Sequence, residues 1–201
     1  MPQAIILDTN IRSTELIRPV YSQLDPDKLG GAMCAMCDGQ SMADYVQNVH
    51  GLVDRHGWAL QYVNSEVNSN FDPDNAGVIE PAFCYTVGLT ALGHPELIVT
   101  GRSPGESAAA LNTLARRVIL GGRAFDPGME CTAAGFDFHF VDVTYCDEWL
   151  LMASEVYPSD RIRAVQAVWR DSQGDLPWEG DVSSTIVQPI LGTPLGWGLY
   201  D

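Results

Sequence analysis

The stretch PAFCYTVGLTALGHPELIVTG, residues 81–101, decides the fold class. Two apolar runs, AFCYTVGL and PELIVTG, stand on either side of the short segment TALGH. Both runs are rich in the β-branched and aromatic residues that are favoured in strands. Pro95 lacks a backbone N–H and suits the first position of a strand. The stretch therefore predicts a β-hairpin.

Two helices with clear start signals flank this hairpin. Ser41 is followed three residues later by Asp44, and Ser103 by Glu106, which is the spacing of a capping box. Apolar residues then recur at helical spacing until a glycine ends each segment. We expect helices over residues 41–56 and 103–120.

The remaining elements are read from shorter patterns. We expect strands over 58–63 and 136–145, a helix over 147–157 and a strand that ends at Trp169; AIILD, residues 4–8, would add a short edge strand. Because helices and strands do not alternate strictly, the order predicts an α+β fold, with two to three helices packed on a mixed, mostly antiparallel sheet. Residues 1–32 would form an N-terminal arm, 33–192 a single domain and 193–201 a C-terminal tail.

Length and charge restrict the partner classes. The chain has 201 residues, 46% of them hydrophobic, which is enough to bury one core. Lys+Arg 11 against Asp+Glu 26 gives a net charge of −15. Such a surface repels nucleic acids and anionic membranes. It either keeps the protein soluble or provides a surface for a basic protein or peptide partner. Separately, we expect a homo-oligomer. With neither an export signal nor a membrane span in the sequence, we expect a cytoplasmic protein.

Cys34 and Cys37 form a C-x-x-C motif just before the first predicted helix. Three interpretations remain open. The two thiols could pack in a loop, they could supply half of a tetrahedral site for zinc or another divalent metal, or they could form a redox pair.

Two histidines and a carboxylate are further candidates. His56 ends the first predicted helix, and His94 lies in the hairpin turn beside Glu96. A neighbouring carboxylate raises the pKa of an imidazole and orients it, as a general base or a metal ligand requires. Helix capping and ordinary turn chemistry are the structural alternatives. We expect the helix end and the turn to meet around a shared pocket.

Several segments together resemble a known family. CAMCDGQS, VDRHGWAL, FCYTVGLTALGHPELIVTG, a helix containing LN, and VQAVWRDSQGDLPWEGD occur in that order. They resemble the bacterial family called domain of unknown function 4262 over about residues 33–192, a resemblance that implies no particular reaction. The hairpin and capped helix are also similar to the suppressor-of-fused superfamily, which would imply an α/β sandwich and a protein-binding or immunity role. The resemblance gives these motif positions: His56, Trp58, Tyr85, Gly88, His94, Glu96 and Trp169.

The main interpretation is a binding or interaction domain for a peptide, protein or small ligand, because no catalytic signature is complete. The alternative is a small metal- or thiol-dependent enzyme built on Cys34 and Cys37, or an accessory enzyme of biosynthesis with the loop 64–77 as a lid. In an enzyme the catalytic candidates would be His56, His94, Glu96 and Tyr85, and Trp58 and Trp169 would line the pocket.

Overall fold

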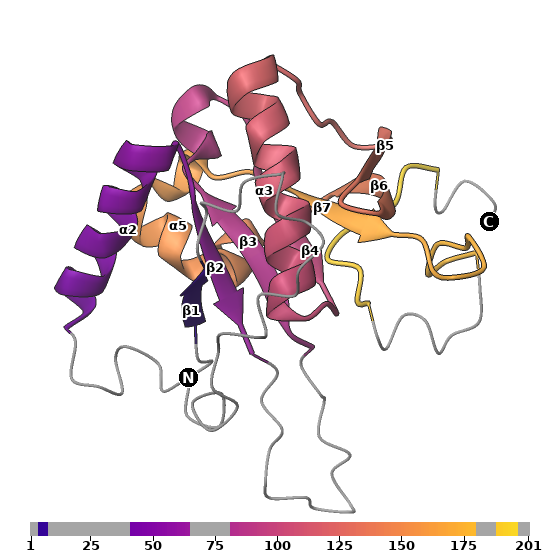
Figure 1. Ribbon diagram of the computed structural model, residues 1–201, viewed down its shortest axis with the longest axis horizontal. Helices are drawn as coiled ribbons and strands as arrows, with labels where there is room; N and C mark the ends of the chain where they lie inside the picture. The colour runs from indigo at the N-terminus through magenta and orange to yellow at the C-terminus, as the bar shows by residue number, and fades with distance from the viewer. Residues whose placement is uncertain (1–3, 8–40, 65–80, 180–187, 197–201) are drawn as a thin grey trace, which may run out of the picture.

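A computed structural model describes residues 4–7, 41–64, 81–179 and 188–196. Its centre is a seven-stranded sheet in the order β1-β2-β3-β4-β7-β6-β5 (Figure 1). The β4–β7 pair is parallel and every other neighbouring pair is antiparallel. The strands are β1 (Ala4–Leu7), β2 (Ala59–Val63), β3 (Phe83–Val87), β4 (Glu96–Thr100), β5 (Glu130–Ala133), β6 (Phe136–Asp142) and β7 (Ala164–Trp169).

This architecture confirms the predicted α+β fold with a mixed sheet. The predicted hairpin is the antiparallel β3–β4 pair, and the short 3-10 helix η2 (Leu89–Leu92) forms its turn. The predicted edge strand is β1, which pairs with β2. Strand β5, which we did not predict, adds an edge on the other side.

In the described part of the chain, four helices pack on the sheet rather than the two to three expected. They are α2 (Met42–His56), α3 (Pro104–Gly121), α4 (Cys146–Trp149) and α5 (Leu151–Val156), and a second 3-10 helix, η3 (Ser159–Arg161), precedes β7. The extra helix arises because the segment predicted as one helix over 147–157 is broken at Leu150. That residue has φ −102 and ψ 53, outside the helical region, and its side chain is fully buried.

The start signals of the two long helices are confirmed. The Ser41 side chain accepts a hydrogen bond from the Asp44 N–H at 3.2 Å. Ser103 and Glu106 form a complete capping box with Pro104 in the first turn. Gly57 caps the end of α2 at φ 90, a left-handed conformation that favours glycine.

The sheet carries a hydrophobic core on each face. Helix α3 covers one face, where it packs on alternate residues of β2, β3 and β4, including Leu60, Cys84 and Leu97 (Figure 1). Helices α2 and α5 cover the other face, where Ala59, Tyr85 and their neighbours point. Within the described residues, no helix is both long and apolar enough to cross a membrane.

The segment 188–191 closes over β7 through a buried glutamine. Gln166 donates from Nε2 to the Pro189 carbonyl at 2.7 Å and accepts at Oε1 from the Leu191 N–H at 2.8 Å. Gln188 in turn bonds to both backbone groups of Trp169. These residues therefore belong to the folded body, and a backbone hydrogen bond from the Thr144 N–H to the Leu191 carbonyl at 3.0 Å also holds them there.

Candidate functional site

Glu96, the first residue of β4, has a fully buried carboxylate. Its Oε1 accepts from the Gly88 N–H at 3.0 Å, and from the N–H and the hydroxyl of Thr90 at 2.9 and 2.8 Å. Its Oε2 accepts from the Thr86 hydroxyl at 2.6 Å and the Leu89 N–H at 3.3 Å. Burial raises the pKa of this carboxyl group, and the hydrogen bonds, that from Thr86 foremost, oppose the shift.

The turn supplies these donors because of its backbone shape. Gly88 has φ 141, a conformation that L-residues rarely adopt, and it directs three successive N–H groups toward one point at the start of η2. Such a concave group of N–H donors binds anions. Here the chain supplies its own anion, the Glu96 carboxylate, which fixes the turn between β3 and β4.

His94 uses both ring nitrogens within the fold. Nε2 accepts a hydrogen bond from the Phe125 N–H at 3.0 Å, so the ring proton is on Nδ1, which donates to the Pro95 carbonyl at 2.6 Å. Burial lowers the pKa of His94, which keeps the ring neutral. The imidazole thus connects the hairpin turn to the segment after α3.

The aromatic candidates are likewise bonded to neighbouring elements, and they lie on both faces of the sheet. Trp58 and Trp169 belong to the core under α3; their indole N–H groups donate to Asn112 Oδ1 at 2.9 Å and to the Thr100 carbonyl at 3.0 Å. Tyr85 lies on the opposite face, where its hydroxyl accepts from the Met152 N–H at 3.0 Å. The sheet therefore separates Tyr85 from the two tryptophans.

The end of α2 and the hairpin turn do meet, through backbone contact. A Cβ built on Gly88 would lie 2.5 Å from the Gly57 carbonyl oxygen and 2.8 Å from the Cα of Trp58. His56, the last residue of α2, is half-buried beside this contact. Two backbone segments, Gly57–Trp58 and the turn at Gly88, thus pack closely where we expected a pocket to begin.

The predicted metal ligands Cys34 and Cys37 lie outside the described residues, as does the loop from residue 65 to residue 77. Among the residues that are described, no group of three or more His, Cys, Asp or Glu side chains is arranged to hold a metal ion. Cys84 is fully buried, and burial strongly raises the pKa of its thiol. That thiol stays protonated, and the zinc prediction for Cys34 and Cys37 stays a prediction.

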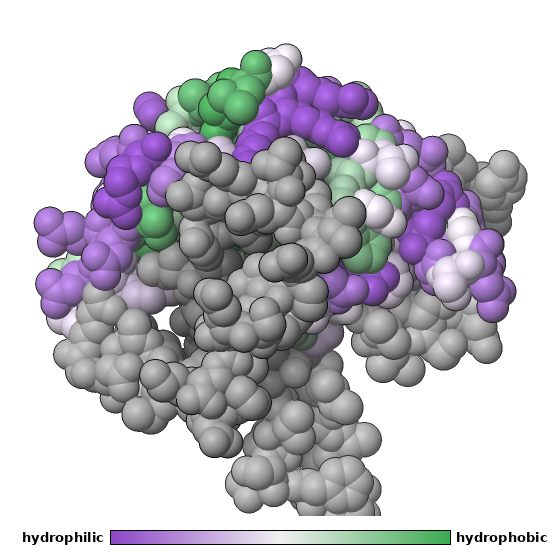
Figure 2. All heavy atoms as spheres, viewed as in Figure 1, coloured by the Kyte–Doolittle hydropathy of each residue, from purple (hydrophilic) through white to green (hydrophobic). Residues whose placement is uncertain are grey.

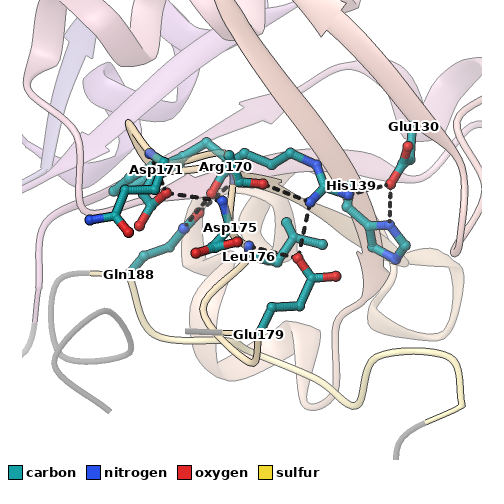
Figure 3. A network of polar contacts seen from close by, with 11 residues as sticks. Glu130, His139, Arg170, Asp171, Asp175, Leu176, Glu179 and Gln188 are labelled. Carbon is teal, nitrogen blue, oxygen red and sulfur yellow. Dashed lines mark hydrogen bonds and ion pairs between the residues drawn. The ribbon is translucent and has the colours of Figure 1, made fainter. Parts of the chain in front are cut away.

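A second polar cluster is centred on Arg170, just after β7. Figure 3 shows Arg170 between two carboxylates, Glu130 at 2.8 Å and Glu179 at 3.0 Å. His139 approaches the same Glu130 oxygen at 3.3 Å, and its ring contacts Trp178 edge to face. The Arg170 guanidinium lowers the pKa of Glu130. The cluster joins β5, β6 and the loop after β7, and it is partly exposed, so each ion pair by itself contributes little stability.

Three residues with definite roles were missed in the sequence. Asn112 had a usable signal, because it is a polar residue within the apolar stripe of a helix and is buried at 2% exposure. Arg170 lies inside the quoted motif VQAVWRDSQGDLPWEGD, but its partner Glu130 is 40 residues away. Thr86, which donates to Glu96 and accepts from the Leu97 N–H, resembles any other strand threonine.

Comparison with known proteins identifies a family and no characterised relative. A model of the family described as domain of unknown function (DUF4262) matches residues 52–183. No curated protein and no solved structure matches the chain. The similarity to the suppressor-of-fused superfamily stays a prediction.

Proposed function

We propose that this chain, which belongs to the DUF4262 family, is a binding domain for a protein or peptide and that its family motif serves the fold. The main support for the proposal is that the polar groups of the motif form hydrogen bonds within the fold. Glu96, His94, Tyr85, Trp58 and Trp169 each direct their polar atoms to the backbone or side chains of neighbouring elements.

Acid–base catalysis requires a group that exchanges a proton with a substrate within hydrogen-bond distance. Protonation of His94 at Nε2 would set an N–H against the Phe125 N–H, and a substrate at Glu96 would have to displace donors that hold the turn. A reaction at either His94 or Glu96 would therefore disrupt hydrogen bonds that hold the local structure. This argument favours recognition by the surface over reaction at the motif.

The net charge of −15 favours a basic protein or peptide as partner for the molecule as a whole. Six of the eight described arginines, however, lie at one end of the molecule, so the preferred partner depends on the face that it approaches.

Isolation of a partner and titration with the purified components test the proposed function. The full chain is immobilised and incubated with bacterial lysate, captured proteins are identified, and each is then titrated by calorimetry. We expect saturable stoichiometric binding that a Cys34→Ser/Cys37→Ser variant retains. If no captured protein binds after purification, the proposal is wrong.

Elemental analysis of the purified chain addresses the enzyme alternative directly. A binding domain predicts substoichiometric metal in the wild-type protein. One zinc per chain that is lost in the Cys34→Ser/Cys37→Ser variant would instead favour the metal-dependent enzyme, with His56 as a candidate for a remaining ligand. His94 could be a ligand only after its Nε2 releases the Phe125 N–H.

A further inference from the structure

One end of the molecule combines exposed leucines with most of the described positive charge. The described part of the chain has eight arginines and no lysine. Six of the arginines lie at the end where α2 and α3 stop and where β4 and β7 begin (Figure 1). We call this end the arginine face; its members are Arg55, Arg116, Arg117, Arg123, Arg161 and Arg163, with Leu92 and Leu120.

Contacts around the hairpin turn make this a continuous surface. Arg163 donates from its guanidinium to the Gly93 carbonyl at 3.2 Å, which places the start of β7 beside η2. The Phe125 N–H donates to His94, and Arg123 lies 5.5 Å from the Phe125 ring centroid. The segments after α3 and before β7 therefore both adjoin the same turn.

The end of α2 joins the same surface through α3. The Cδ1 atom of Ile119 lies 2.6 Å from the place where Gly57 would carry a Cβ. Arg55 lies two residues before Gly57, and Leu120 directly follows Ile119. The ends of both long helices are thus parts of one face.

Leu92 is 60% exposed and Leu120 is 83% exposed. Figure 2 shows hydrophobic surface at the top of the view, where α3 and η2 end in Figure 1, beside strongly hydrophilic side chains. A single exposed leucine needs no explanation. Two on adjoining elements, at the end of the molecule that carries the arginines, combine apolar surface with charge as a protein interface does.

The charge on this face is available to a partner. Arg55, Arg123, Arg161 and Arg163 are exposed, and none of them forms an ion pair with a carboxylate of the described chain. Carboxylates lie at this end as well: Asp54, Asp126 and Asp160 are near the arginines in the sequence. Asp142 pairs with Val165 at the start of β7. The chain as a whole has 26 acidic residues against 11 basic ones.

We propose that the arginine face binds an acidic peptide segment that presents a large apolar side chain. Guanidinium groups bind carboxylates with paired, charge-assisted hydrogen bonds, and Leu92 and Leu120 offer an apolar contact. The acidic remainder of the surface repels such a peptide, which directs it to this end. The inference rests on the proposed binding function and specifies an acidic partner for this face.

Selection from a random peptide library on the immobilised full chain tests the proposal. We expect enriched peptides with net negative charge and at least one Leu, Ile, Phe or Trp. One enriched peptide is then synthesised with a fluorophore, and its affinity is measured by anisotropy at two salt concentrations. We expect weaker binding at the higher salt concentration.

Two sets of variants locate the binding site. An Arg123→Glu/Arg161→Glu/Arg163→Glu variant and a Leu92→Ser/Leu120→Ser variant should each weaken binding about tenfold or more. The matched control is Met42→Ser/Leu151→Ser, which changes two exposed apolar residues away from this face, 46% and 55% exposed, and should bind as the wild type does. Thermal unfolding confirms that each variant is folded.

Each contrary result has a separate meaning. The proposal for the arginine face is wrong if the enriched peptides are basic, or if both face variants still bind them. Either result leaves the proposed binding function unaffected. If no peptide is enriched, the proposal for the arginine face is also wrong. The calorimetric titration then still tests the binding function separately. A dimer in sedimentation velocity that the Leu92→Ser/Leu120→Ser variant dissociates would assign the face to a second copy of the chain and overturn the peptide proposal.

Discussion

Glu96 holds the hairpin turn through five hydrogen bonds to one buried carboxylate. Glu96→Gln keeps the size of the side chain but replaces one acceptor oxygen by an NH₂ group, which then faces N–H or O–H donors. We expect a loss of about 1–3 kcal/mol in the free energy of unfolding, measured by urea denaturation. The control Glu148→Gln changes an exposed carboxylate and should stay within about 0.5 kcal/mol of the wild type. Equal stability of the two variants would contradict the structural role of Glu96.

His94 makes stability depend on pH. Its folded-state pKa lies below the usual 6.5, so protonation favours the unfolded chain. The stability that neutral His94 contributes is complete above pH 6.5 and is lost as the pH falls from 6.5 through the lower folded-state pKa. We expect the free energy of unfolding to fall between about pH 7.5 and pH 5.5, and to fall less in a His94→Gln variant. The control His50→Gln, at an exposed position, should keep the wild-type slope, and a slope that His94→Gln leaves unchanged would assign the effect to another group.

In the 3-10 turn between β3 and β4, the stability of the fold depends more on Gly88 than on Gly93. Gly88→Ala would place a Cβ 2.5 Å from the Gly57 carbonyl oxygen at φ 141, whereas Gly93→Ala at φ 75 meets no atom within 4 Å. We expect Gly93→Ala to lower the free energy of unfolding by about 1–2 kcal/mol, which is the cost of a left-handed backbone conformation for alanine. Gly88→Ala should cost more than that, because two backbone segments must move apart. Chemical denaturation of both variants measures the difference, and equal costs would mean that the contact between the turn and α2 does not restrict the fold.

Local signals in the sequence predicted most of the elements, because caps and alternation act within a few residues. Ser41 and Ser103 placed the helix starts, and Pro95 with its flanking apolar runs placed the hairpin. Strand β5 was missed because Glu130–Ala133 is short, half polar and at a sheet edge. The break at Leu150 was missed because leucine is a good helix former, and its burial and its non-helical backbone appear only in the folded chain.

The sequence predicted which residues belong to the motif but not what they do. Glu96 and His94 are neighbours in the chain, yet each bonds to other partners, Glu96 to the turn before it and His94 to Phe125, 31 residues away. The partners of Trp58 and Trp169 lie 54 and 69 residues away. Pairings of that range depend on the arrangement of the sheet and helices, which no local pattern encodes.

At the scale of the whole molecule, the residues that maintain the fold and the residues proposed to bind a partner lie in different places. Those of the motif point into the two cores and join strands to helices, while the arginine face gathers charge and exposed leucines at one end of the sheet. The account therefore predicts that stability and binding respond to different substitutions. Variants inside the motif should lower the free energy of unfolding, and variants on the arginine face should lower affinity.

The affinity of the selected acidic peptide for two folded variants tests this division most directly. Trp58→Phe removes the indole hydrogen bond to Asn112 inside the core, and Arg123→Glu/Arg161→Glu/Arg163→Glu reverses charge on the surface. The account predicts an affinity within about twofold of the wild type for Trp58→Phe and a loss of about tenfold or more for the arginine variant. A folded Trp58→Phe variant that loses binding while the arginine variant keeps it would contradict the account.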